Sequence, residues 1–554
     1  MNARKLLVIS LLAALLAAAC APAAPATRPP IVATSEVQGP PLAGRQSGQP
    51  IQPEAGLATG APAPTYPPPP AADLYRSAEP QAPGLLPPWP PYPTYPPYAT
   101  PWPERPSYDI GVNPFMDARE DHLSTFAMDV DTASYTKMRD YINSGQLPPA
   151  DLVRVEEFVN YFSMEYPDPT SGAFSINLEG GPSPFGGEST WLLRVGIQGR
   201  HIAGWERKDA LLTYVIDVSG SMQEENRIDM VKAGLSRLVD RLGPNDRVAI
   251  VAFSETAWVV LEPTSVENRY RILDAINGLY PMNSTNTEAG LRLGYELAHR
   301  HYRDGAINRV ILASDGVANV GNTDPSVLAQ YAQDYYGRNI FLSTVGVGHG
   351  NYNDVLLEQL ADKGNGVYSF LDSPQAAERI FSQDLEGTLQ TIAKDAKIQV
   401  DFNPNVVHSY RLLGYENRAV ADQDFRNDNV DAGEVGAGHS VTALYEVRLS
   451  LEVGGEIAIV RVRYEDPDTH AVAEQSEAIR ADELQRDFNR TSPRFQLAAA
   501  VAQYAETLRI SPWTSREQLR RVVDLAWSVQ RQLPFDADVA EFAQLVERAA
   551  SLTD

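Results

Sequence analysis

The fold is decided at residues 211–221, which read Leu-Leu-Thr-Tyr-Val-Ile-Asp-Val-Ser-Gly-Ser. The continuous apolar run at 211–216 is typical of a strand that is covered on both faces. Asp217, Ser219 and Ser221 follow it at once and carry oxygen-bearing side chains. The next segment, 227–242, places its apolar residues on one helical stripe. The sequence therefore predicts a strand, an oxygen-rich loop and a helix in succession.

The same rhythm continues along the centre of the chain. Further strands are predicted at 248–253, 310–313, 340–347 and 367–370, with helices between them at 288–299, 327–336 and 354–360 and a long last helix at 375–392. Alternating strands and helices favour an α/β domain over 208–395, with a doubly wound, mostly parallel sheet and helices on both sides. Sites in such sheets lie beyond the carboxyl ends of the strands.

Shorter β-like runs flank this domain on both sides. Strands are predicted at 173–178 and 191–197 before it, and at 398–402, 410–413, 441–451 and 457–464 after it. Two short segments are too few to bury a face alone. The simplest solution is that they pair with the later strands in one β-sandwich, into which the α/β domain is inserted, since inserted domains with neighbouring ends are well tolerated.

The remaining segments complete the expected domain organisation. Residues 107–207 form an N-terminal flanking module of helices and then strands, and 396–554 form a C-terminal β module followed by helices at 494–508, 516–530 and 539–550. Residues 20–106 hold 26 of the 43 prolines. Proline fixes φ and removes donors, so this stretch favours an extended tether over a packed fold.

The N-terminus has the pattern of a signal peptide. Arg4 and Lys5 are followed by an apolar run at 6–16, which is shorter than the roughly 20 residues a spanning helix needs. Small residues then lead to Cys20, the one cysteine in the chain, so no intrachain disulfide can form. This resembles the lipobox of bacterial lipoproteins, although Ala17 stands where Leu is usual. The resemblance implies cleavage of 1–19, lipidation of Cys20 and a place on the extracytoplasmic face of the bacterial envelope, with the membrane contacted through the lipid.

The charge balance narrows the class of partner. Lys and Arg number 46 against 71 Asp and Glu, which gives a formal net charge of −25. Such a chain repels phosphate backbones, and the sequence has no basic stripe that could follow one. Nucleic acid is therefore not an expected partner.

Three segments supply oxygen ligands at predicted strand ends. Asp217, Ser219 and Ser221 follow the first strand, Thr285 precedes a helix, and Asp315 follows the strand at 310–313. Hydroxyls and few carboxylates suit a hard cation such as Mg²⁺, with Mn²⁺ or Ca²⁺ as alternatives. Helix capping by these residues is the competing interpretation. Together the five residues resemble the metal-ion-dependent adhesion site of von Willebrand factor type A (vWA) domains, which implies that the exposed Asp or Glu of a protein partner completes the metal's coordination.

The resemblance extends over nearly all of 107–554. Residues 123–135, 351–366, 412–418 and 431–439 are similar to the flanking modules and vWA domain of a family of bacterial vWA lipoproteins. The family's molecular role is poorly defined, so the match implies architecture more than biology.

An enzyme is the main rival to metal-dependent partner binding. Asp129-Val130-Asp131-Thr132 fits the opening motif of haloacid-dehalogenase-type phosphatases, in which the first Asp is a nucleophile. However, the run before it is short for a buried strand and no alternating sheet follows closely, so a turn with a helix cap is the simpler interpretation. We find no positioned base or nucleophile beside the expected metal and predict that the chain is not an enzyme. A metal-dependent phosphatase or hydrolase and a metal-independent scaffold remain alternatives.

Overall fold

The computed structural model describes residues 111–553, except 188, 283, 317–323, 349–353, 384–388, 429, 431 and 451–453. Cys20 and the expected tether at 20–106 lie outside the described residues. Among the helices that are described, none combines the length and the apolar character that crossing a membrane requires.

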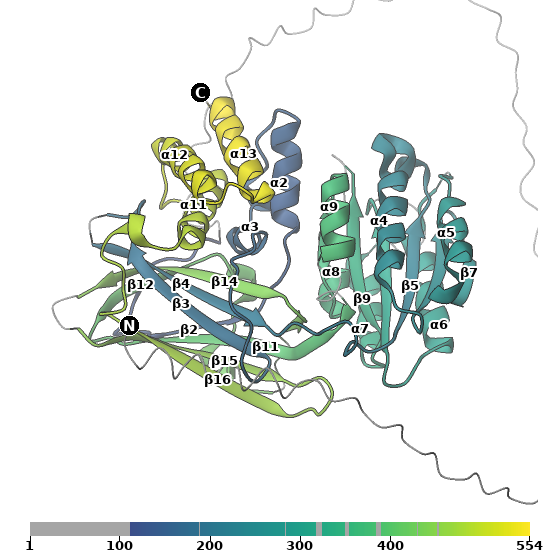
Figure 1. The fold of residues 1–554 in the computed structure, drawn as a ribbon, viewed down its shortest axis with the longest axis horizontal. Helices are drawn as coiled ribbons and strands as arrows, with labels where there is room; N and C mark the ends of the chain where they lie inside the picture. The colour runs from purple at the N-terminus through teal and green to yellow at the C-terminus, as the bar shows by residue number, and fades with distance from the viewer. Residues whose placement is uncertain are drawn as a thin grey trace, which may run out of the picture. The chain divides into compact units, whose positions relative to one another are not determined.

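The centre of the chain folds into a six-stranded sheet in the order β10-β9-β8-β5-β6-β7. Figure 1 labels β9, β5 and β7 of this sheet. All neighbouring strands are parallel except the edge strand β7, which is antiparallel to β6. The predicted doubly wound, mostly parallel sheet is therefore confirmed. Its strands are β5 (Ala210–Asp217), β6 (Arg247–Phe253), β7 (Ala257–Ser265), β8 (Ile307–Ser314), β9 (Phe341–Val347) and β10 (Tyr368–Leu371).

Helices cover both faces of this sheet, and β5 shows why its sequence is apolar throughout. Tyr214 and Ile216 pack in a core with Val231 of α4, whereas Val215 packs in a second core with Leu291 of α6. The helices are α4 (Arg227–Arg241), α5 (Arg269–Asn277), α6 (Thr287–Arg300), α7 (Pro325–Tyr336), α8 (Asp354–Lys363) and α9 (Pro374–Glu378).

The helix α6 lies unusually close to the sheet. A Cβ atom at Gly294 would lie 2.3 Å from Val215 Cγ2, and one at Gly290 would lie 2.5 Å from the Phe253 ring. Glycine at these two positions lets the helix backbone approach the strands. This close packing fixes the start of α6, and with it the loop that carries Thr285.

The last helix of the domain differs from the prediction. The expected helix at 375–392 is wrong at its end, because Thr391 and Ile392 belong to strand β11 (Thr391–Phe402). The α-helix α9 passes into a π-helical turn at Arg379–Gln383, beyond which 384–388 lie outside the described residues. Thr391 pairs with Gly436, and Ile392 is buried in the sandwich core. Strand pairing and burial thus override the local helical pattern.

The predicted insertion into a single β-sandwich is confirmed. One sheet has the order β1-β12-β14-β4-β3, and in it Val195 of β4 pairs with Ala443 of β14 across the whole inserted domain. The other sheet has the order β13-β11-β15-β16, and β2 pairs with β11. The remaining strands are β1 (Met116–Asp117), β2 (Leu123–Ala127), β3 (Phe174–Pro182), β4 (Thr190–Gly199), β12 (Val407–Leu413), β13 (Gly433–Gly436), β14 (Ser440–Leu449), β15 (Glu456–Glu465) and β16 (Val472–Arg480).

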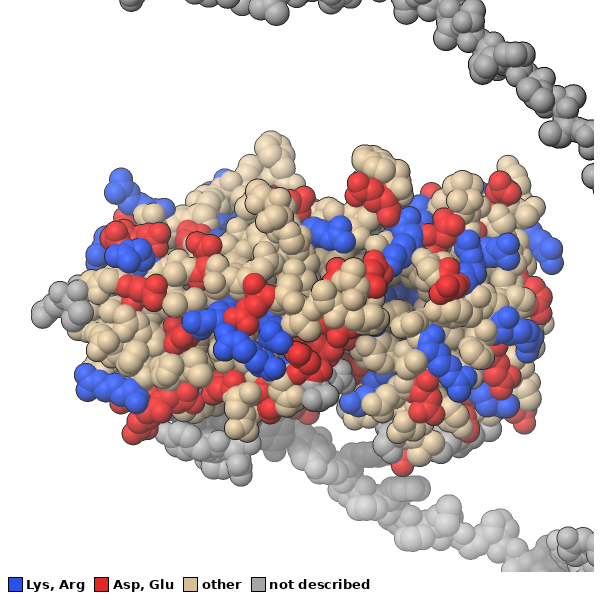
Figure 2. Space-filling model, turned by 90° about the horizontal axis from the view of Figure 1, so that it is seen from below, with Lys and Arg blue, Asp and Glu red and all other residues tan. Residues whose placement is uncertain are grey.

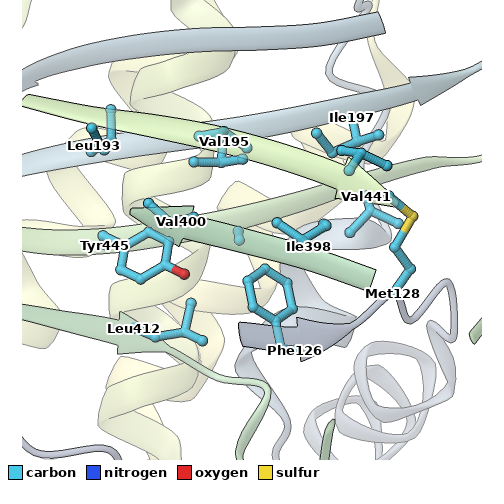
Figure 3. Packing of buried hydrophobic residues seen from close by; sticks show 14 of the residues in the cluster. Phe126, Met128, Leu193, Val195, Ile197, Ile398, Val400, Leu412, Val441 and Tyr445 are labelled. Carbon is cyan, nitrogen blue, oxygen red and sulfur yellow. The ribbon is translucent and has the colours of Figure 1, made fainter. Parts of the chain in front are cut away.

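The core of the sandwich joins segments that are far apart in sequence. Figure 3 shows Val195 and Ile197 of β4, Ile398 and Val400 of β11 and Phe126 of β2 in one apolar layer. These five side chains are at most 1% exposed. The residues before and after the inserted domain therefore form one hydrophobic core.

A layer of helices covers the outer face of the first sheet (Figure 1). Leu192 of β4 and Leu444 of β14 share a core with Phe158 of α3 and Phe495 of α11. The layer consists of α2 (Ala133–Asn143), α3 (Val155–Asn160), α11 (Pro493–Leu508), α12 (Arg516–Gln532) and α13 (Ala537–Thr553). On the face shown in Figure 2, acidic and basic side chains lie next to one another rather than in separate areas.

Charged side chains hold the α/β domain against the flanking module. Arg418 contacts Asp362 of α8 at 3.2 Å, and Arg139 of α2 contacts Asp372 at 2.7 Å. Arg154 contacts Glu358 of α8 at 3.0 Å. We call the contacts made by Arg139, Arg154 and Arg418 the docking surface.

Candidate functional site

The end of β5 forms a tight loop in which two hydroxyls meet. The Ser219 N–H donates to Asp217 Oδ1 at 2.8 Å, and Ser219 Oγ lies 3.0 Å from Ser221 Oγ. The Val218 N–H donates to Phe253 O at the end of β6, at 2.9 Å, and this bond fixes the loop to the sheet. Asp217 and Ser219 are fully buried, whereas Ser221 is half-buried.

The end of β8 brings a second carboxylate to the same place. Ser314, the last residue of the strand, donates from Oγ to Asp217 Oδ2 at 2.6 Å. Asp315 follows it and is 2% exposed. Parallel neighbouring strands end at the same edge, which is why β5 and β8 deliver both carboxylates to one site.

The loop that carries Thr285 is tied to the same edge. The Met282 N–H donates to Val218 O at 2.5 Å, and the Asn286 N–H donates to Ser254 O at 2.7 Å. Thr285 itself is 2% exposed. We call Asp217, Ser219, Ser221, Thr285 and Asp315 the oxygen cluster.

Helix capping does not account for Ser219, and the N-cap of α6 is Asn286. The side chain of Asn286, rather than Thr285, accepts from the Ala289 N–H and caps α6. Ser219 precedes a 3₁₀ turn without making a side-chain cap hydrogen bond, and the same holds for Asn226 in front of α4. The oxygens of Asp217 and Ser219 therefore face one another rather than a helix end.

The oxygen cluster concentrates negative charge in a buried place. Burial and the charge of Asp315 raise the pKa of Asp217 to about 6, while hydrogen bonds from Ser314 and Ser219 lower it. Arg227 of α4 brings one positive charge, with Nη1 3.3 Å from Asp315 Oδ2 and 3.3 Å from Ser221 O. Two buried carboxylates next to one another favour a cation between them.

The donor set fits a small, hard cation better than a soft one. Among the described residues, no three His, Cys, Asp or Glu side chains gather as they would in a metal site built from these residue types. The cluster instead combines two carboxylates with hydroxyls, which suit Mg²⁺. Neighbouring ligands on an octahedron with bonds of about 2.0–2.1 Å lie about 2.9 Å apart. The 3.0 Å between Ser219 Oγ and Ser221 Oγ matches that spacing.

Two further residues belong to the site and were not found from the sequence. Ser314 bonds Asp217 directly, and Arg227 bridges Ser221 and Asp315. The position of Ser314 next to Asp315 at a strand end was the available signal. Arg227 has no local signal, because its role depends on how α4 packs beside β8.

The phosphatase-like motif at Asp129 and Asp131 has a different environment. Asp129 contacts Arg418 at 2.9 Å, and the Tyr368 N–H of β10 donates to Asp131 Oδ1 at 3.1 Å. Burial raises the pKa of Asp131 well above its usual value. Asp131 therefore contacts the α/β domain directly, whereas Asp129 pairs with Arg418 within the flanking module, and β2, which precedes them, belongs to the antiparallel sandwich.

Models of known families match three parts of the chain. Residues 212–383 match the von Willebrand factor type A domain, and residues 104–194 match a family described as von Willebrand factor. Residues 387–454 and 450–552 match the C-terminal family of the uncharacterized protein YfbK.

Individual proteins are also similar to this chain. The uncharacterized protein YfbK of Escherichia coli K12 is 34% identical over 467 residues, which cover 80% of each chain. The uncharacterized protein sll0103 of Synechocystis is 26% identical over 283 residues, 50% of this chain and 66% of its own length. A solved von Willebrand factor type A structure from Catenulispora acidiphila aligns with 67% of this chain and 89% of its own, at 18% identity and a TM-score of 0.41.

The match to YfbK extends well beyond the α/β domain, and the modules matched on either side of that domain are those that build the sandwich and the helical layer. The chain therefore belongs to the YfbK family of bacterial proteins with a von Willebrand factor type A domain.

Proposed function

We propose that this chain is a lipid-anchored protein of the bacterial envelope whose vWA domain binds a divalent metal and, through the metal, a carboxylate of a protein partner. The observation that carries the proposal is the meeting of Asp217, Ser219, Ser221 and Asp315 at one edge of the sheet. A vWA domain is itself indicative of protein binding or adhesion.

The residues of the oxygen cluster would share the coordination. The hydroxyls of Ser219 and Ser221 bind a metal without adding charge, and Asp217, Asp315 and Thr285 bind it directly or through water. With few direct carboxylates the ion stays electrophilic, and an open position remains for an Asp or Glu of the partner. Mg²⁺ is the expected ion, with Mn²⁺ and Ca²⁺ as alternatives.

Metal binding is tested by thermal unfolding of the full chain with and without Mg²⁺. An ion that binds only the folded state stabilises it by about 2.7 kcal/mol at a hundred times its Kd. We expect Tm to rise with Mg²⁺ in the parent and not in Asp217→Ala. Asp209→Ala, which changes a half-exposed carboxylate outside the cluster, is the matched control and keeps the response. If Mg²⁺ raised the Tm of the parent and of Asp217→Ala equally, Asp217 would not be a metal ligand and the proposed site would be wrong.

Partner binding is tested by capture from envelope extracts with Mg²⁺ or with a chelator. A partner that binds through the metal is released by the chelator and is not captured by Asp217→Ala. A partner that is retained in both cases supports the scaffold alternative instead.

The anchor is tested separately at Cys20. Cys20→Ala is expected to move the chain from the membrane to the soluble fraction, because the acyl chains would be its attachment. A variant that remains in the membrane fraction with unchanged electrophoretic mobility would contradict lipidation.

A further inference from the structure

A cleft of about 810 Å³ runs along the outer edge of β3, on the side of the sandwich where β3 and β16 are both edge strands. Both faces of β3 contribute to its lining. Ile176 and Leu178 pack toward the sandwich core, whereas Glu179 pairs with Arg194 on the face covered by helices. A cleft lined by both faces of a strand must follow the edge of that strand. We call it the edge cleft.

The hydrogen-bonding pattern of β3 shows which main-chain groups face the edge cleft. Ala173 O accepts from the Arg200 N–H at 2.9 Å, and the Ser183 N–H donates to Thr190 O at 2.8 Å. Odd-numbered residues of β3 therefore bond to β4, and the main-chain groups of even-numbered residues point outward, as alternation in an antiparallel pair requires.

Only the middle of this edge is open. Phe174 O accepts from Gln475 Nε2 at 3.2 Å, and Gly180 O accepts from the Gln485 N–H at 2.9 Å. Between them, the outward main-chain groups of Ile176 and Leu178 meet no hydrogen-bond partner among the described residues. An edge of unpaired N–H and C=O groups is a template for another strand.

Two buried arginines line the helical side of the edge cleft. Arg194 is 6% exposed and donates from Nη2 to Glu179 at 2.7 Å, while the rings of Tyr166 and Phe495 lie 5.2 and 5.8 Å from its guanidinium carbon. Its Nε and Nη1 have no partner among the described residues. Aromatic rings cover the faces of a guanidinium but do not satisfy the N–H groups in its plane.

Arg494 repeats the arrangement. It is 8% exposed, pairs with Asp536 at 2.6 Å and also with Glu165, and its Nε has no partner among the described residues. An unsatisfied buried donor costs about 1–3 kcal/mol, so a shift of either side chain that brings these N–H groups to an acceptor in the cleft is favoured. The opposite rim carries exposed Glu477 and Glu483, which disfavour further acidic groups there.

We propose that the edge cleft binds an extended peptide segment of a partner protein, which adds to β3 as a strand and places one Asp or Glu against Arg194 and Arg494. Side chains alternate along a strand. The residues on either side of the acid therefore face the apolar wall formed by Ile176, Leu178 and Ile479. The bound peptide segment is thus extended, and its sequence has an acidic residue between two apolar residues. This site is independent of the oxygen cluster.

The pairing is tested with N-methylated peptides. The probe is a fluorescein-labelled Thr-Lys-Val-Glu-Val-Lys-Thr peptide, titrated with the full chain and followed by fluorescence anisotropy. Two isomers carry N-methyl groups on alternate residues, so that each blocks one edge of the peptide. We expect one isomer to lose about tenfold or more in affinity, since it loses its main-chain hydrogen bonds, and the other to bind as the parent peptide does. Equal affinity of the two isomers would overturn strand addition.

The acidic residue is tested in the peptide and in the protein. Replacing Glu by Gln in the probe is expected to reduce affinity by about tenfold, because charge-assisted hydrogen bonds are the stronger ones. In Arg494→Gln the difference in affinity between the Glu and Gln peptides should shrink, while the exposed control Arg531→Gln keeps the full difference. If Arg494→Gln does not show the parent's cooperative melting, Arg194→Gln serves for the same comparison. Retention of the full Glu preference in a folded arginine variant would overturn the assignment.

Two further experiments test what binds in the edge cleft. Binding that persists in a chelator separates this site from the proposed metal-dependent function, and binding that disappears with the chelator contradicts their independence. Sedimentation of the chain alone reports self-association. If the chain self-associates and the probe competes with that association, the edge belongs to a second copy of the chain and the proposal is wrong.

Discussion

Two of the places where this molecule buries carboxylates neutralise the charge in different ways. In the oxygen cluster, Asp217 accepts from the hydroxyl of Ser314, and Asp315 meets the cation of Arg227. At the docking surface, Asp129 and Asp362 converge on Arg418 at 2.9 and 3.2 Å. The carboxylates of the oxygen cluster lie close to one another and to hydroxyls, whereas those of the docking surface share an arginine.

The comparison shows why similar motifs have different roles. Asp217-Val218-Ser219 and Asp129-Val130-Asp131 both place an acid two residues before a polar residue. The first follows a strand of a parallel sheet, and the second follows a strand of the sandwich. The environment of the motif, more than its letters, determines whether its first acid meets hydroxyls or an arginine.

The largest expected effect on stability comes from removing the Arg418 side chain. Arg418→Ala leaves Asp129, Asp131 and Asp362 without their common cation, and breaking a buried pair typically costs about 3–5 kcal/mol. We expect urea unfolding to show this loss, or a separate early transition of the α/β domain. Arg426→Ala, which removes an exposed pair with Glu474, is the control and should change stability little. If the two variants lost the same free energy of unfolding, the ion pairs of the docking surface would contribute no more to stability than an exposed pair.

An intermediate effect is expected from pH. Burial and the charge of Asp129 raise the pKa of Glu157, close to the docking surface, from 4.5 to about 8. The folded state then binds more protons than the unfolded state, so stability present at low pH is lost as pH rises from 4.5 toward 8.

We expect the free energy of unfolding to fall across this pH window. Glu157→Gln keeps an acceptor for the Ser134 N–H, which donates to Glu157 Oε2 at 2.7 Å, and should flatten the profile. Chemical denaturation at several pH values measures it. If Glu157→Gln showed the same change of unfolding free energy with pH as the parent, the pH dependence would come from other groups.

The smallest effect is expected at Arg227. Arg227→Gln removes a positive charge that lies 3.3 Å from Asp315 Oδ2 and would compete with a metal ion. Metal affinity, measured by calorimetry, should rise by about threefold, since screening by solvent limits the loss of repulsion. An unchanged or lower affinity would show that Arg227 orders the loop more than it opposes the metal.

The sequence predicts most of the architecture because its signals are periodic. The apolar run of β5 and the helical stripe of α4 are recognisable locally, and they are enough for the α/β domain. β16 is missed because its exposed and half-buried residues give no apolar pattern. The end of the helix predicted at 375–392 is wrong because the burial of Ile392 depends on strands that follow much later.

In the candidate site, too, some residues can be recognised from the local sequence and others only from contacts between distant elements. Asp217, Ser219 and Ser221 are adjacent in sequence, so their spacing alone suggests a common ligand. Arg227 gains its position only when α4 packs beside the end of β8, and no local pattern reports that contact, whereas Ser314 meets Asp217 through the pairing of β8 with β5. Likewise, the open edge of β3 cannot be recognised before its partner strands are known.

The insertion of the α/β domain has a consequence for the order in which the chain folds. When β4 has been synthesised, its partner strand β14 is still more than two hundred residues away, as the pairing of Val195 with Ala443 shows. The inserted domain contains all six strands of its own sheet, so it is able to fold before the sandwich is complete. Until β14 arrives, β3 and β4 remain as a hairpin with an unpaired edge, and such long-range pairing is slow and prone to aggregation. The chain thus depends on its middle folding first, so that the two halves of the sandwich are brought together before β4 finds another strand.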